Sequence, residues 1–201
     1  MWSIIWAFLR YFVLFFYKIY YNLKFEGTEN IPHNGGHIFA SNHRSNADPV
    51  FLTLKVPARF SYMAKKELFE KNFFVTCLII ALGAYPVDRG KGDTGAIDTA
   101  IEKLKIGKNF MIFPEGQRSK DGKVGKGKSG IALIAAKAQT DVIPVGIIFD
   151  GKLKFRRKVI IRYGKPIPPE KLAVSDPPQK TELKALVNTV MGEIEHLVYK
   201  N

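Results

Sequence analysis

The chain has 201 residues, of which 46% are hydrophobic and 24% charged, a balance typical of a globular domain with a sizeable core. Its net charge of +13 favours a polyanionic partner. The chain contains no zinc-ligand spacing, basic zipper or aromatic RNA-binding strand, so we expect no nucleic-acid partner. A single cysteine, Cys77, excludes an intrachain disulfide, and no metal-ligand cluster is visible.

Residues 1–24 are predicted to form an N-terminal membrane-associating helix, because 10 of the first 21 residues are aromatic. Ser3, Arg10, Tyr17 and Lys24 recur every seven residues, so they share one stripe, which we expect to face water. No basic region precedes the apolar run, which disfavours a secretory signal. Arg10 would cost roughly 2.5–3.5 kcal/mol at mid-bilayer, so a helix lying in the interface is favoured over a span. A helix packed on the domain's own core is the alternative.

Residues 25–201 are predicted to form a single domain in which strands and helices alternate. This order favours an α/β layered domain, with a largely parallel or mixed sheet flanked by helices. The expected strands lie near 37–41, 59–64, 109–113, 142–149 and 158–162. The expected helices lie near 49–56, 67–81, 93–106, 129–138 and 181–199.

The first candidate site follows the apolar run at 38–40 and spans Asn42 to Pro49. His43 stands at the predicted strand end, and Asp48-Pro49 fits an N-cap and the first position of a helix. An aspartate one loop away from a histidine can hold the imidazole in one tautomer, which makes the pair a candidate general base with its orienting acid. Taken separately, His43 is most simply a loop residue and Asp48 is most simply a helix cap.

The second candidate site is Phe113-Pro114-Glu115-Gly116-Gln117-Arg118-Ser119, a turn that leaves another apolar run. Arg118 offers a planar fork of donors suited to a phosphate. A local ion pair between Glu115 and Arg118 is the alternative.

A third pattern, Gly122 to Ser129, satisfies the P-loop spacing Gly-x4-Gly-Lys-Ser. A P-loop needs a strand that runs directly into its first glycine. Here the strand is predicted to end near Phe113, so a P-loop nucleotidase is disfavoured but remains open.

The first two motifs together resemble those of the glycerol-phosphate acyltransferase superfamily, and most closely the 1-acylglycerol-3-phosphate acyltransferases. That family carries His-x4-Asp and, later, Pro-Glu-Gly-x-Arg-Ser, and Gln117 stands where it usually has Thr or Ser. Two further blocks match in order, Lys65 to Leu68 with the span from Gly83 to Arg89, and the proline-centred run from Val142 to Gly146.

The resemblance implies that a fatty acyl group moves from a thioester to the 2-hydroxyl of 1-acylglycerol-3-phosphate, giving phosphatidic acid. It assigns the base to His43 and its orientation to Asp48. The residues that it implies for binding are Arg118, Arg89, Lys65 and Glu115 at the substrate phosphate and glycerol, and Ile143 and Pro144 along the acyl channel. Direct transfer is implied, rather than an acyl-enzyme on Ser41, Ser45 or Cys77.

Several partners follow as expectations from the same resemblance. The donor is acyl-coenzyme A or acyl-acyl carrier protein, and no further cofactor is needed. The acceptor is lysophosphatidic acid or, within the same superfamily, another lysophospholipid. The lipid substrates and the positive charge favour peripheral or monotopic binding to an anionic bilayer, at the cytoplasmic face of the cell membrane.

Overall fold

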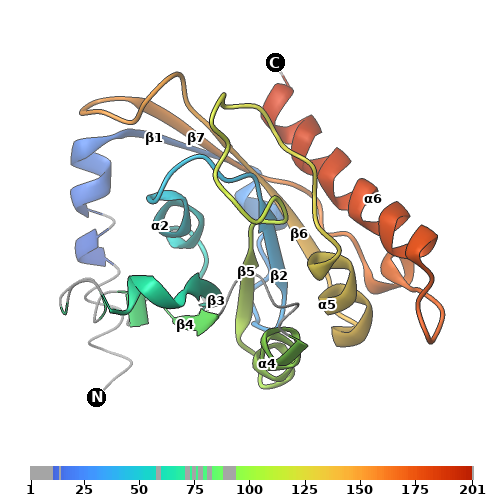
Figure 1. The fold of residues 1–201 in the computed structure, drawn as a ribbon. Coiled ribbons are helices and arrows are strands. Elements are labelled where there is room, and N and C mark those ends of the chain that lie inside the picture. The colour runs from blue at the N-terminus through green and yellow to red at the C-terminus, as the bar shows by residue number, and fades with distance from the viewer. Residues whose placement is uncertain are drawn as a thin grey trace.

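The computed structural model contains one seven-stranded sheet with helices on both of its faces (Figure 1). It describes residues 11–13, 15–57, 60–70, 73, 76, 79–80, 83–87 and 94–200. The strands are β1 (Asn22–Glu26), β2 (Ile38–Ser41), β3 (Phe60–Lys65), β4 (Ala84–Val87), β5 (Asn109–Ile112), β6 (Val142–Ile148) and β7 (Lys158–Tyr163). The α-helices are α2 (Asp48–Thr53), α4 (Thr94–Lys105), α5 (Gly130–Ala138) and α6 (Lys180–Tyr199). The short 3-10 helices are η1 (Thr28–Asn30), η2 (Lys66–Leu68) and η3 (Pro169–Leu172).

The strand order across the sheet is β1-β7-β6-β2-β5-β3-β4. The five strands from β6 to β4 in this order run parallel, whereas β7 is antiparallel to β6 and parallel to β1. The sheet is therefore mixed and flanked by helices, as the sequence predicted. Because the parallel strands end at one edge, the loops after β2, β5 and β6 meet there, where α/β sheets usually bind ligands.

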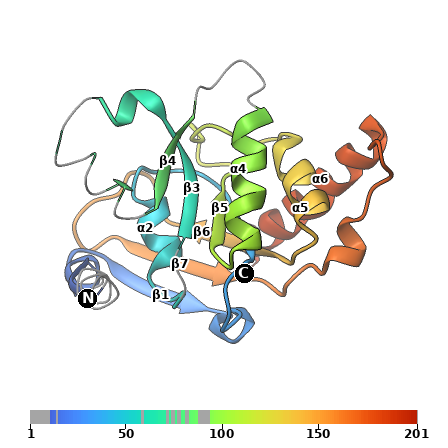
Figure 2. The ribbon, with the colours of Figure 1, turned by 90° about the horizontal axis from the view of Figure 1, so that it is seen from below.

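The strand β2 lies at the centre, and its side chains alternate between the two faces of the sheet. Phe39 belongs to the apolar cluster that contains Phe51 of α2, whereas Ile38 and Ala40 belong to the cluster formed with α4, α5 and α6. All of these β2 side chains are fully buried. Viewed from below, α4, α5 and α6 lie on one side of the strands and α2 on the other (Figure 2). The buried central strand gives the loop that follows it a rigid base.

The described part of the N-terminal segment is helical at residues 11–13 and 15–20, and residues 22–24 belong to β1. Its orientation differs from the prediction. Tyr17, placed on the stripe expected to face water, packs together with Tyr21 against Phe51, while Phe15 and Phe16 are 60% and 50% exposed. The side that carries Tyr17 thus meets the protein, and the side that carries Phe15 and Phe16 is open. Among the described helices, none combines the length and apolar character needed to cross a bilayer.

Candidate active site

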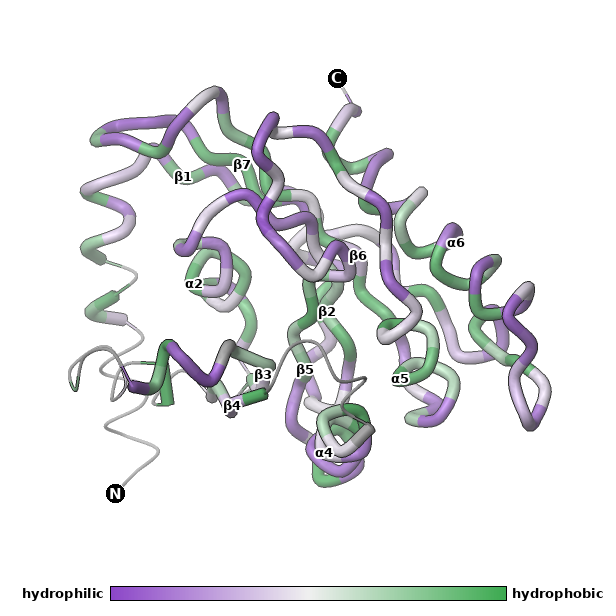
Figure 3. The backbone as a smooth tube through the Cα atoms, in the orientation of Figure 1, coloured by the Kyte–Doolittle hydropathy of each residue, from purple (hydrophilic) through white to green (hydrophobic). Residues whose placement is uncertain are grey.

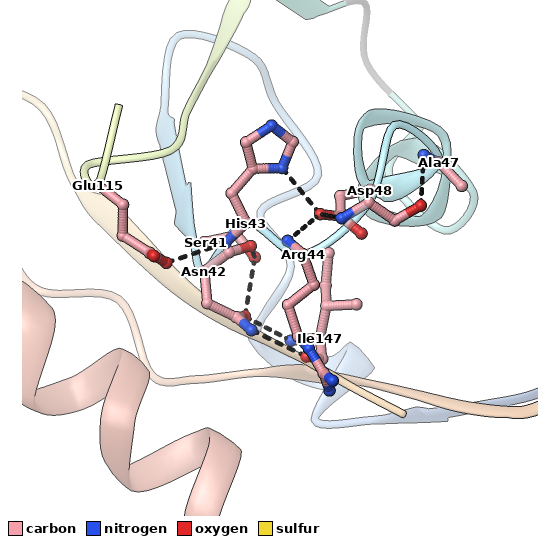
Figure 4. A network of polar contacts seen from close by, with 9 residues as sticks. Ser41, Asn42, His43, Arg44, Ala47, Asp48, Glu115 and Ile147 are labelled. Atoms are coloured by element: carbon pink, nitrogen blue, oxygen red, sulfur yellow. Dashed lines mark hydrogen bonds and ion pairs between the residues drawn. The ribbon is translucent and has the colours of Figure 1, made fainter. Parts of the chain in front are cut away.

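The candidate site lies at the carboxyl edge of the parallel strands, where the loop after β2 meets the loop after β5 and the end of β6 (Figure 4). Hydrophilic residues predominate along the loop from β5 to α5 and along the loop from β6 to β7 (Figure 3). Apolar strands thus place a set of polar loops at one edge, as a catalytic site requires.

Asn42 joins the end of β2 to its neighbour β6. Its side-chain Nδ2 donates to the carbonyl of Ile147 at 2.9 Å, and its Oδ1 accepts from the N–H of Ile147 at 2.8 Å. The residue is 1% exposed, so these bonds form away from water, where an unpaired amide is costly. The position of the next residue, His43, is therefore fixed by a buried two-way pairing.

The imidazole of His43 is bonded to the carboxylate of Asp48. Nδ1 and Oδ2 lie 2.8 Å apart, and the same Oδ2 accepts the backbone N–H groups of Arg44 at 2.6 Å and Ser45 at 2.7 Å. Because a carboxylate can only accept, the Nδ1 nitrogen carries the proton and Nε2 is left as the basic nitrogen.

Asp48 is the first residue of α2 and Ala47 is the N-cap, one position earlier than the sequence predicted. The Asp48 side chain makes no capping bond to the helix, because its oxygen is directed to the N–H groups of the preceding loop. Asp48 is fully buried, and its Oδ1 has no hydrogen-bond partner among the described residues.

A second side chain fixes the plane of the imidazole. The rings of His43 and Phe113 stack with centroids 4.1 Å apart and an interplanar angle of 18°. The carbonyl of His43 also accepts the N–H of Ser119 at 2.8 Å. The loop after β5 therefore supports both the ring and the backbone of the histidine.

Glu115 holds the His43 loop from the opposite side. Its Oε1 accepts the backbone N–H of His43 at 3.0 Å, and the carboxylate also accepts the N–H of Gly125. Burial raises the pKa of Glu115, while these two hydrogen bonds oppose the shift. The described ion pairs include none between Glu115 and Arg118, so the local ion pair considered from the sequence does not form.

The other predicted site residues are placed less closely around His43. Arg118 is exposed and lines a hollow beside the His43 loop, with Arg44 and Ser119. Lys65 ends β3, and only its backbone is described; Arg89 and Cys77 lie outside the described residues. Ile143 and Pro144 are buried within β6, Ile143 in the core cluster of α2. Among the described residues, no group of acidic, histidine and cysteine side chains is arranged to hold a metal ion.

The region from Gly122 to Ser129 does not form a P-loop. The strand β5 ends at Ile112, and nine residues, Phe113 to Asp121, separate it from Gly122. Gly122 packs on Arg44, while Gly127 lies against Met191 and Val187 of α6. The P-loop reading is therefore wrong for this chain.

The comparison with known families agrees with the geometry. A family model described as Acyltransferase matches residues 22–148, which include the His43–Asp48 pair, Glu115 and Arg118. The chain belongs to the acyltransferase family. Its family resemblance was thus correctly predicted from the motif order.

Related acyltransferases are found among curated proteins. The chain is 33% identical over 161 residues to the 1-acyl-sn-glycerol-3-phosphate acyltransferase of Streptococcus pneumoniae, which covers 77% of this chain and 59% of that protein. It is 31% identical over 183 residues to the protein of the same name from Bacillus subtilis, with 89% of each chain covered. A chloroplastic relative from Arabidopsis thaliana is matched over 38% of its length. The chain therefore spans well under two thirds of some of these acyltransferases and most of the Bacillus subtilis one.

A solved acyltransferase has the same fold. The crystal structure of the 1-acyl-sn-glycerophosphate (LPA) acyltransferase PlsC from Thermotoga maritima superposes with a TM-score of 0.72 and 28% sequence identity. The superposition covers 98% of this chain and 82% of that one.

Two residues of the site received no role from the sequence. Asn42 begins the first motif, but its pairing with Ile147 joins strands that are 105 residues apart. Arg44 likewise reaches across to the carbonyl of Phe149. Each contact depends on β6 lying beside β2, which local sequence does not reveal.

Proposed function

We propose that this chain transfers a fatty acyl group from a thioester donor to the 2-hydroxyl of 1-acylglycerol-3-phosphate, forming phosphatidic acid. The observation that carries the proposal is the 2.8 Å bond between His43 Nδ1 and Asp48 Oδ2, in a chain of the acyltransferase family whose relatives have this activity as their name.

In the proposed mechanism, Nε2 of His43 takes the proton of the acceptor hydroxyl as its oxygen attacks the thioester carbonyl. Asp48 keeps the imidazole in the required tautomer and stabilises the imidazolium that forms. The tetrahedral intermediate collapses with loss of the thiolate, which is protonated by the imidazolium. The bond from the acyl carbon to the acceptor oxygen thus forms, the bond from the acyl carbon to sulfur breaks, and no acyl-enzyme is made.

The acceptor phosphate needs cationic groups near His43. Arg118 is the described candidate, because it is exposed and its loop bonds to the His43 backbone through Ser119. Lys65 and Arg89 are proposed by resemblance to complete this binding. Glu115 acts in this proposal by holding the His43 loop in place, and Ile143 and Pro144 form an inner wall toward the acyl chain.

We propose acyl-coenzyme A or acyl-acyl carrier protein as the donor, with no additional cofactor. Both donors are anionic, which suits a chain of net charge +13. Coenzyme A and acyl carrier protein are both released as free thiols, so the same assay detects transfer from either donor.

The proposal includes binding to an anionic bilayer, since acceptor and product are lipids. The N-terminal helix exposes Tyr11, Phe12, Phe15, Phe16, Ile19 and Tyr20. The loop from β6 to β7 adjoins it, because the Tyr20 carbonyl accepts the N–H of Arg156 at 2.7 Å and the rings of Tyr20 and Phe155 lie 5.5 Å apart. Exposed aromatic rings beside the basic residues of this loop are typical of a surface that lies in the headgroup region. This supports peripheral or monotopic binding to a bilayer, which the proposal places at the cytoplasmic face of the cell membrane.

The test is acyl transfer by the purified chain with oleoyl-coenzyme A or oleoyl-acyl carrier protein and a panel of lysophospholipids. We expect thiol release to require lysophosphatidic acid and to match phosphatidic acid formation mole for mole. His43→Ala is the matched inactive control. A preference for lysophosphatidylcholine or lysophosphatidylethanolamine would show that the acceptor is another lysophospholipid. Thiol release without any acceptor would identify a thioesterase instead.

A further inference from the structure

A hollow of about 520 Å³ opens beside the His43 loop, at the carboxyl edge of the sheet. Its wall is formed by residues 44–46, 118–122, 149 and 151–153, from the loops after β2, β5 and β6. Four cationic side chains line it, Arg44, Arg118, Lys120 and Lys152, against the single acid Asp121. The hollow is therefore strongly electropositive, one residue along the chain from the proposed base.

Arg44 is half-buried in the wall of this hollow and is held by Phe149. Its Nη1 donates to the Phe149 carbonyl, and its guanidinium carbon lies 4.2 Å from the centroid of the Phe149 ring. Among the described residues, its Nε and Nη2 donate to no acceptor, so part of the donor fork is left for a ligand. A preorganised guanidinium loses little conformational entropy when it binds a phosphate.

The loop after β5 closes over Arg44 without neutralising it. A Cβ on Gly122 would lie 2.7 Å from Arg44 Nη2 and would displace the guanidinium, and the φ of 82° at this position favours glycine. The carboxylate of Asp121 accepts from the Ser119 hydroxyl at 3.0 Å and from the Lys123 N–H at 3.1 Å. These bonds direct the acid to its own loop, and the described ion pairs include none between it and a cation of the hollow.

Lys152 adds a cation from the third loop. It is exposed and follows Gly151, and no hydrogen bond or ion pair within the described part of the chain engages its ammonium. A guanidinium fork with a mobile ammonium opposite is a suitable arrangement for a phosphate group, because the fork sets its orientation and the ammonium adds charge.

We propose that Arg44 and Lys152 bind a phosphate group of one of the substrates in this hollow, beside Arg118, which the proposed function assigns to the acceptor phosphate. The inference rests on the proposed acyl transfer for the identity of that group. The candidate sources are the phosphate of lysophosphatidic acid and a phosphate of the donor. The phosphopantetheine arm that coenzyme A and acyl carrier protein share is the part of the donor that reaches the site.

The experiment measures binding without turnover, by calorimetric titration of the purified full chain with sn-glycerol 3-phosphate and, separately, with coenzyme A. Lys152→Gln removes a charge at an exposed position, so it is expected to fold normally. We expect it to weaken one of the ligands roughly 10-fold, as the loss of one charge-assisted contact does. Arg44→Gln should weaken the same ligand, and the ligand affected identifies the source of the phosphate.

Lys137→Gln is the matched control, since Lys137 is an exposed lysine in the last turn of α5 and lies outside the hollow. Unchanged affinity of Lys152→Gln for both ligands would overturn the inference. An equal loss in Lys137→Gln would overturn it too, because the effect would then be one of net charge. These titrations do not depend on catalysis, so an absence of acyl transfer would refute the proposed function and leave the phosphate site standing.

Discussion

The side-chain amide of Asn42 pairs in both directions with the backbone of Ile147, donating at 2.9 Å and accepting at 2.8 Å. The backbone ladder between β2 and β6 ends with Ser41 opposite Val145, so the amide extends the pairing by a side chain after the strand has ended. The chain can then turn away toward solvent at His43 while the backbone N–H and carbonyl of Ile147 in β6 keep their hydrogen-bond partners. The proposed base thus starts from a position fixed by a neighbouring strand.

Asn42→Ala should destabilise the fold and lower activity together. It leaves the N–H and carbonyl of Ile147 without these partners in a buried place, at a cost of roughly 1–3 kcal/mol for each group that stays unsatisfied. Urea unfolding measures the loss, and turnover is measured at a temperature where the variant is folded. Asn34→Ala, at an exposed asparagine, is the matched control. Wild-type stability in Asn42→Ala would mean that the pairing contributes nothing.

Asp48→Asn should reduce turnover on the order of 10²–10⁴-fold while largely preserving the fold. The Asn oxygen in the place of Oδ2 can still accept the N–H groups of Arg44 and Ser45 and the Nδ1–H of His43, but the uncharged amide no longer stabilises the imidazolium that forms during transfer. His43→Ala should lose a similar factor. Asp48→Ala should also lower the melting temperature, since it leaves the N–H groups of Arg44 and Ser45 without their acceptor. A fully active Asp48→Asn would contradict the role assigned to the charge of Asp48.

The parts of the fold that the sequence predicted are those with local signals. Long apolar or amphipathic runs identified β2, β5, β6 and α6 to within a few residues. The edge strands β1 and β4 were not predicted, and residues 22–24 of β1 were assigned wrongly to the N-terminal helix. Lys24 and Glu26 of β1 form an ion pair, so this strand lacks a continuous apolar pattern. Pro86 interrupts the apolar pattern of β4, where an edge strand tolerates the missing N–H. Strand order is a long-range property, so it was not predictable.

The candidate site was predictable to a similar degree. The spacing of His43 and Asp48 indicated a pair, but the capping role given to Asp48 was wrong, since its oxygen serves the loop before the helix. Periodicity also identified the stripe that contains Tyr17, but not which face of that helix meets the protein. Tyr17 faces Phe51 because a ring with a polar tip can both fill an apolar gap and reach water.

Glu115→Gln should change the pH dependence of stability. Burial raises the pKa of Glu115 above its usual 4.5, so the native state holds this proton more tightly than the unfolded state. The resulting stabilisation is complete below the unfolded pKa and is lost as pH rises through the native pKa. Wild type should therefore lose stability relative to Glu115→Gln as pH rises from about 4.5. Parallel curves of unfolding free energy against pH would contradict the raised pKa.

Arg118→Lys should weaken use of the lysophospholipid more than use of the donor. Lysine keeps the charge but loses the planar fork, so a phosphate loses one of its paired contacts, worth roughly tenfold in affinity. Steady-state kinetics with each substrate varied in turn measure the two KM values. Lys123→Arg, at an exposed position of the same loop that does not line the hollow, is the control for altered loop packing. Equal increases in both KM values would assign Arg118 a structural role.

The last prediction concerns the exposed aromatic face. Removing residues 1–21 would also remove Tyr17 and Tyr21 from Phe51, so a deletion mixes loss of membrane contact with loss of core packing. Point changes avoid this problem. Phe155→Ser, alone and combined with Phe15→Ser and Phe16→Ser, should weaken binding to anionic vesicles, because each ring would otherwise insert apolar area among the headgroups.

Ile106→Ser provides the matched control, since Ile106 follows α4 and is 65% exposed, close to the 61% of Phe155. Sedimentation with vesicles of phosphatidylcholine and phosphatidylglycerol, at low and high salt, separates the apolar and the electrostatic parts, because salt screens only the second. The combined variant should retain salt-sensitive binding and lose most of the binding that survives high salt. It should also use lysolipid in detergent better than lysolipid in vesicles. If Ile106→Ser weakened sedimentation as much as the combined variant, general exposed hydrophobicity would explain the binding, and this face would not be the membrane contact.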